Sequence, residues 1–172
     1  MRAALAAILL FAAAAPAPGQ QRFNPAAAEN RQVLATFNYG NVETVLTQIG
    51  ARFERRGTAE RPMLGVTFPN NRRGAIVFGA CEQQGAVCKS ISIQAIWPRP
   101  AAAAAAARLP GAIQAFNLRY AFARGYLTAD GRPALQRYLT ADYGFIRGNL
   151  AVNLLVFANQ ADRFAGEVMR AR

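Results

Sequence analysis

The chain has 172 residues, of which 53% are hydrophobic and 17% charged, so it can form the core of one domain but is too short for two ordinary ones. Twenty basic and nine acidic residues give a net charge of +11, and there is no histidine. The absence of histidine excludes Ser-His-Asp and Cys-His catalysis and imidazole metal sites, and Lys89 is the only candidate for Schiff-base chemistry.

The first 17 residues predict a secretory signal peptide. Met1-Arg2 is a short positive start, residues 3–15 are apolar, and small residues and prolines follow. The apolar run is too short to cross a bilayer, which needs about 20 apolar residues, and no second membrane segment follows. Cleavage after Ala15 or Ala17 would place the mature chain in the periplasm or outside the cell. An alanine-rich anchor or a buried helix is the alternative.

Residues 18–36 predict a linker, and one domain is expected over residues 37–172. Asn41 fits a helix N-cap, and apolar residues follow it at helical spacing as far as Gly50. Extended strands are expected next at residues 52–56, 63–68, 75–80 and 88–97.

The last of these strands alternates strictly, with Ile91 and Ile93 on one side and Ser90 and Ser92 on the other. Successive side chains of a strand point to opposite faces of a sheet. The pattern therefore predicts an antiparallel meander with one apolar face and one wet face.

Cys81 and Cys88 are separated by six residues and lie between two of the expected strands. In an oxidising compartment this spacing predicts a disulfide that clamps a hairpin. Free or redox-active thiols are the alternative, although a redox-active pair usually has C-x-x-C spacing.

In the second half, residues 101–107 are a run of alanine, either a helical extension or a loop insertion, and a helix is expected at residues 112–120. Asp130-Gly131 predicts a hairpin turn between strands at residues 122–127 and 134–139. A long helix is expected from its cap at Asn149 nearly to Arg170. The summed order, α-βββ(β)-α-ββ-α, predicts an α+β fold with a mostly antiparallel sheet and helices packed on one face.

The long helix carries one apolar stripe, which needs a surface to cover it. It is spaced 4-3-4-3-4 through Leu150, Leu154, Phe157, Ala161, Phe164 and Val168. The stripe either packs on the chain's own sheet or forms part of a groove or dimer seam for a partner. The candidate partner-binding residues are Phe157, Phe164, Leu154 and Trp97.

Nineteen of the twenty basic residues are arginine, and they are densest at two expected hairpin ends. These candidate anion-binding residues are Arg55, Arg56, Arg61, Arg72 and Arg73. Guanidinium groups match phosphate and carboxylate geometry, so the residues could hold anionic envelope polymers or lipid headgroups. A solvated basic surface without a ligand is the alternative. Nucleic-acid binding is not expected, because export separates the chain from cytoplasmic nucleic acid and no aromatic residues are interleaved with the arginines.

We expect no catalytic, cofactor or metal site. The sequence has neither phosphate-binding glycine motif, and its two serines do not form a nucleophile elbow. Asp130 and Asp142 are the only carboxylate pair that could serve acid–base chemistry, and Asp130 precedes Gly131, where turn geometry favours aspartate.

Several segments resemble the YbjN-domain family, whose members are described as regulators of bacterial sensory transduction. The segments are Phe116-Asn117, residues 122–131, Pro133-Ala134-Leu135, Gly148-Asn149-Leu150 and the turn around Cys81. With residues 46–53 upstream and residues 153–164 in the last helix, the resemblance covers about residues 37–168. The resemblance implies a fold like that of type III secretion chaperones, which are dimers that hold a partner polypeptide. This chain departs from the family in its signal peptide, its alanine run and Phe145-Ile146-Arg147 before the last helix.

We therefore expect an exported, non-enzymatic YbjN-like binding or regulatory module. It would recognise a polypeptide partner in the cell envelope, as a homodimer and without a cofactor. The alternative is a basic envelope-surface protein that binds anionic polymers or lipid headgroups electrostatically.

Overall fold

The computed structural model describes residues 23–82 and 87–170, so the expected signal peptide lies outside the described residues. The elements in chain order are the 3₁₀ helix η1 (Ala28–Arg31), β1 (Val33–Leu34), α1 (Tyr39–Gln48), β2 (Arg52–Gly57), β3 (Pro62–Thr67), β4 (Arg73–Glu82), β5 (Val87–Ile96), α2 (Ala103–Arg119), β6 (Arg124–Leu127), β7 (Pro133–Thr140), β8 (Phe145–Ile146) and α3 (Arg147–Glu167).

Six strands form one antiparallel sheet in the order β2-β3-β4-β5-β7-β6. The first four strands form a meander, and the β6–β7 hairpin joins it where β7 pairs with β5. The short strands β1 and β8 form a separate ladder. The predicted α+β class and mostly antiparallel sheet are confirmed.

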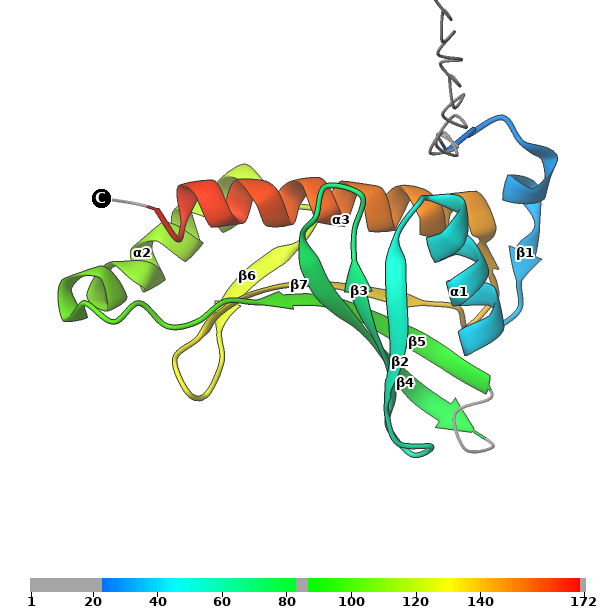
Figure 1. Ribbon diagram of the computed structural model, residues 1–172, viewed down its shortest axis with the longest axis horizontal. Coiled ribbons are helices and arrows are strands. Elements are labelled where there is room, and N and C mark those ends of the chain that lie inside the picture. Colours follow the sequence, from blue (N-terminus) through cyan, green and yellow to red (C-terminus); the bar gives the residue numbers. More distant parts are fainter. Residues whose placement is uncertain (1–22, 83–86, 171–172) are drawn as a thin grey trace, which may run out of the picture.

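The helices cover one face of this sheet. Figure 1 shows α3 running along that face, with α1 beside its N-terminal half and α2 near its C-terminal end. Alternate strand residues point toward α3 and form the core with its apolar stripe; they include Leu64, Ile76, Phe78, Ile91, Ile93, Leu135 and Leu139. Among the described residues, no helix lies over the opposite face, which we call the open face (Figure 1).

The first and last α-helices, α1 and α3, begin earlier in the chain than the sequence predicted. The N-cap of α1 is Asn38, whose side chain accepts a hydrogen bond from the Asn41 backbone N–H at 2.9 Å. The Asn41 side chain accepts one in return from the Asn38 N–H, which completes a capping box. Asn41 is thus the third helical residue and not the cap. Likewise α3 begins at Arg147, so Asn149 lies inside the helix and does not cap it.

The alanine run is a helical extension and not a loop insertion. It continues into the expected helix, so that α2 covers Ala103–Arg119 with Pro110 inside it. Its apolar contacts begin only after the run, at Leu109, Ile113 and Phe116, which are all buried. None of the helices in the described part of the chain is long and apolar enough to cross a membrane.

Part of the expected linker is folded onto the domain. Leu34 in β1 is buried, and β1 pairs with β8 just before α3. Asn30 is also buried, and its side-chain oxygen accepts a hydrogen bond from Gln48 Nε2 at 2.9 Å. Because this segment is mostly polar, the sequence did not predict that Leu34 is buried in the core.

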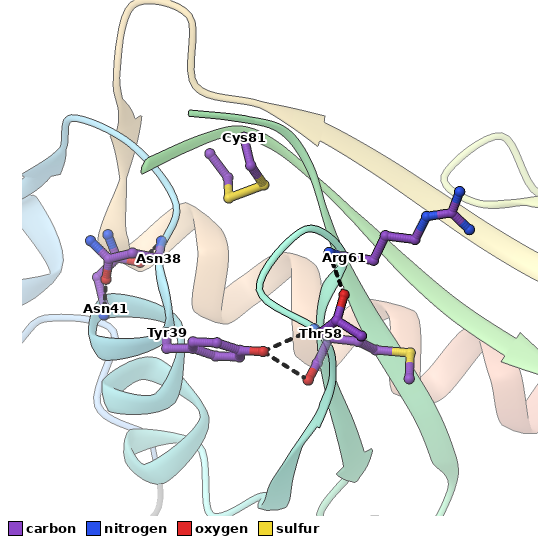
Figure 2. Close-up of a disulfide and its surroundings, with 8 residues drawn as sticks. Asn38, Tyr39, Asn41, Thr58, Arg61 and Cys81 are labelled. Carbon is purple, nitrogen blue, oxygen red and sulfur yellow. Dashed lines mark hydrogen bonds between the residues drawn. A yellow bond between two sulfur atoms is a disulfide. The ribbon is translucent and has the colours of Figure 1, made fainter. Parts of the chain in front are cut away.

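The predicted disulfide is present between Cys81 and Cys88, which are cross-strand partners in the β4–β5 ladder. The backbone of Cys88 also pairs with that of Phe37, with N–H to O distances of 2.8 and 2.9 Å. The disulfide is thereby joined to the segment that leads into α1, near the Asn38 cap (Figure 2).

Candidate binding surface on the open face of the sheet

The apolar stripe of α3 packs on the chain's own sheet. Leu154, Phe157 and Phe164 are fully buried, and Trp97 stacks on Phe164 with ring centroids 4.8 Å apart. These four candidate partner-binding residues do not form an exposed groove or seam. Side chains on the helix-covered face therefore hold the fold together.

The open face contains a row of residues that is charged at one end and aromatic at the other. Strand register places this row across five strands, in the order Arg56, Met63, Val77, Ser92 and Tyr138. Arg56 and Tyr138 are exposed, the tyrosine by 58%. An extended chain laid along this row would meet a cation first and an aromatic ring last.

The middle of the open face is less wet than the alternating pattern predicted. Ser90 and Ser92 are buried on this side, although the sequence placed them in solvent. Gln94 and Gln136 lie over the sheet and each donates an Nε2 hydrogen bond to Ser92 Oγ, at 2.9 and 2.5 Å. The amide side chains from two neighbouring strands thus cover Ser92.

Three arginines surround an open depression of about 440 Å³ at the β2–β4 end of this face. Arg52 and Arg56 come from β2 and Arg73 from β4, and we call this feature the arginine depression. Arg52 and Arg73 form no ion pair with any carboxylate in the described part of the chain. The single acid in its lining is Glu54, which pairs with Arg56 while both remain exposed.

Gly65 forms part of the floor and leaves room for Arg56. A Cβ at this position would lie 2.8 Å from Arg56 Nε, so the guanidinium crosses the strand where a side chain would otherwise stand. Arg56 therefore lies across the sheet in the lining of the depression while its side chain stays 58% exposed.

The other arginines that the sequence singled out lie elsewhere. Arg55 points to the helix-covered side, where it forms a bidentate pair with Glu43 of α1 at 2.6 and 2.8 Å and lies over the Tyr39 ring. The hydrogen bond to Glu43 raises the pKa of Arg55. Arg72 pairs with Asp162 of α3.

Arg61 belongs to the turn between β2 and β3. It is exposed, and its backbone N–H bonds to Thr58 Oγ1 at 3.2 Å. Figure 2 shows Tyr39 pointing at this hairpin, where its hydroxyl accepts a hydrogen bond from the Met63 N–H at 3.1 Å. Arg61 is not part of the arginine depression.

Sequence reasoning found Arg56 and Arg73 but missed Arg52. The signal was available, because Arg52, Glu54 and Arg56 are two residues apart in an expected strand and so share one face. Runs of adjacent arginines mislead for the same reason, since neighbours in a strand point to opposite sides.

The two edges of the sheet are protected in different ways. At the β6 edge, the Asn117 side chain accepts a hydrogen bond from Gly125 N–H at 2.7 Å and donates one to Gly125 C=O at 2.9 Å. It thereby occupies the backbone groups that another strand would use. At the other edge, β2 is exposed and rich in charge, which disfavours pairing with a further strand.

The carboxylate pair considered for acid–base chemistry is placed in turns. Asp130 accepts a hydrogen bond from Thr128 and pairs with Arg132, and the Thr128 bond does most to lower its pKa. Neither Asp130 nor Asp142 lines the arginine depression. No group of three or more Cys, Asp or Glu residues that could hold a metal occurs among the described residues.

Comparison with known families adds a match to the YbjN model, described as "Putative bacterial sensory transduction regulator", over residues 38–169. The match begins at the α1 cap and extends through α3, so it includes every strand of the six-stranded sheet. A search among curated proteins finds no match. The family model covers most of the sequence, and the chain belongs to the YbjN family.

Proposed function

We propose that this protein is an exported, non-enzymatic regulatory module that binds a polypeptide partner in the cell envelope through the open face of its sheet. The family description as a sensory transduction regulator supports a regulatory role. The first 17 residues support export, because they have the charge, length and small residues of a signal peptide.

The observation that carries the proposal is a broad sheet face that no helix covers, in a fold whose helices pack on the other face (Figure 1). It presents Tyr138 and Ile96, which are 58% and 43% exposed, on the same face as the arginine depression. Aromatic residues and arginine are the side chains that are enriched where proteins bind one another. The protected edges direct binding to the face and away from strand addition.

The test is photocrosslinking in cells that export the full chain. A photoreactive residue replaces Tyr138 on the open face or, as a matched control, Val152 on the exposed side of α3, which is 45% exposed. We expect one discrete polypeptide adduct from position 138 and none from position 152. No adduct at 138, or the same adducts at both positions, would contradict the proposal.

The proposal includes the homodimer expected from the resemblance to type III secretion chaperones. Light scattering during gel filtration measures the mass directly, and twice the chain mass is the expected result. An adduct of the chain with itself from position 138 would identify the open face as the seam. A single-chain mass at all concentrations would remove the dimer from the proposal but leave the partner intact.

A further inference from the structure

Some arginines of this protein pair with a carboxylate of the chain itself and others do not. The paired ones are Arg55, Arg56, Arg72, Arg119 and Arg132. Arg52 and Arg73 have no such partner in the described part of the chain, and both line the arginine depression. Arginines outside the depression, such as Arg31 and Arg108, also lack an ion pair in the described part of the chain, but the depression brings Arg52 and Arg73 together with Arg56 around one hollow.

We propose that the arginine depression binds the carboxylates of an acidic segment of the partner polypeptide. The inference rests on the proposed function and gives the chemistry of the partner. Guanidinium groups form bidentate pairs with carboxylates, and three of them lie around one hollow beside a single glutamate. Glu54, which pairs with Arg56, is the group that an incoming carboxylate would displace.

The rest of the row favours a polypeptide ligand over a polyphosphate. Arg56 and Tyr138 are partners of the same cross-strand row, four strand spacings apart. That is about 19 Å, the length of about six residues of extended chain. A polypeptide can place carboxylates at one end of this distance and an apolar side chain at the other, whereas a polyphosphate has no apolar group for Tyr138.

The probe is a short fluorescent peptide of alternating glutamate and leucine, with a glutamine-for-glutamate peptide for comparison. Binding to the purified full chain is followed by fluorescence anisotropy. The triple variant R52Q/R56Q/R73Q removes three charges from the depression. The matched control R31Q/R108Q/R170Q removes three from exposed arginines outside it.

We expect the depression triple to weaken binding by about tenfold or more and the control triple by about twofold or less. The wild-type protein should bind the glutamine peptide weakly. Its affinity for that peptide should be no higher than the affinity of R52Q/R56Q/R73Q for the glutamate peptide. All substituted side chains are exposed, so both triples should fold, which circular dichroism checks. A charge swap adds a gain of binding: R52E/R56E/R73E should bind the corresponding lysine–leucine peptide.

Three results would overturn the inference. Equal weakening by both triples would mean a diffuse basic surface. Tight binding of the glutamine peptide would mean that charge does not select the ligand. Depression-dependent binding of polyphosphate or of phosphatidylglycerol vesicles, with no binding of the peptide, would mean another class of ligand. The crosslink from position 138 is a separate experiment that tests the proposed function. If it gives a polypeptide adduct while the peptide assay gives one of these three results, the inference of an acidic ligand is wrong and the proposed function stands.

Discussion

At Gly125 the absence of a side chain is a packing requirement. The residue faces the core from β6, and a Cβ there would lie 2.7 Å from the Phe164 ring and 3.2 Å from Ile113. Gly111 in α2 is the opposite case, since nothing lies within 4 Å of the position of its Cβ. The two glycines differ in surroundings, and the same substitution should act on them with opposite sign.

We predict that Gly125→Ala lowers the free energy of unfolding by about 1–3 kcal/mol, because the ring of Phe164 must move. Gly111→Ala should raise it by about 0.5–1 kcal/mol, because alanine loses less backbone entropy in a helix. Urea unfolding of the two variants measures both values. A stabilising alanine at 125 would mean that β6 and α3 are farther apart than the structure has them.

The position of each arginine along its strand also determines which arginines lie on the same face of the sheet. Arg55 and Arg56 are neighbours in sequence, yet Arg55 pairs with Glu43 on the helix-covered side while Arg56 lines the open depression. Arg72 and Arg73 divide in the same way, with Arg72 paired to Asp162. Adjacent arginines in a strand therefore lie on opposite faces of the sheet, whereas arginines two residues apart lie on the same face.

Among the elements, β6 depends on a single side chain for its outer edge. Asn117 of α2 bonds to both the N–H and the C=O of Gly125. We predict that Asn117→Ala lowers the free energy of unfolding by about 1–3 kcal/mol, because two backbone groups lose their partner.

Asn159→Ala is the matched control, since Asn159 is an exposed residue of α3. That variant should change the free energy of unfolding by about 0.5 kcal/mol or less. Urea unfolding again compares the two. Equal effects would mean that the Asn117 hydrogen bonds contribute nothing beyond helix propensity.

The disulfide ties β4 to β5, and a loop this short should contribute about 2–3 kcal/mol by restricting the unfolded chain. We predict that C81A/C88A unfolds at a lower urea concentration than the wild type, by the amount that corresponds to this loss of stability. Dithiothreitol should also lower the urea midpoint of the wild-type protein. Dithiothreitol should have no effect on the double variant. An unchanged midpoint in reduced wild-type protein would contradict a stabilising role for this bond.

The sequence predicted the elements well where periodicity was strong and their ends poorly. The alternation in β5 and the Asp-Gly turn located the sheet, because both patterns reflect local backbone geometry. Asn149 misled because an asparagine inside a helix looks like a cap when the true start, Arg147, has no capping side chain. The site could be predicted only in part, because the pairing register that brings β2 and β4 together depends on contacts far apart in the chain.

Taken as a whole molecule, the protein has one covered and one open side of a single sheet. The apolar stripe of α3, which looked available for a partner, is used up in the chain's own core. The proposed binding surface is the open face, with three arginines at one end and Tyr138 toward the other. A partner would add the second cover that the sheet lacks.

Export can also be tested on the whole protein. We predict that the chain recovered from the cell envelope lacks its first 15 or 17 residues, since the signal peptidase cleaves after small residues. Intact-mass spectrometry of the fractionated protein gives the cleavage site. Recovery of the uncleaved chain from the cytoplasm alone would contradict export.

The most direct test of the binding surface combines the crosslink with the two arginine triples. The photoreactive residue stays at position 138, and the adduct yield in cells is compared among the wild type, R52Q/R56Q/R73Q and R31Q/R108Q/R170Q. The account predicts an adduct that is strong in the wild type and in the control triple and several-fold weaker in the depression triple. Equal yields in all three proteins would contradict it.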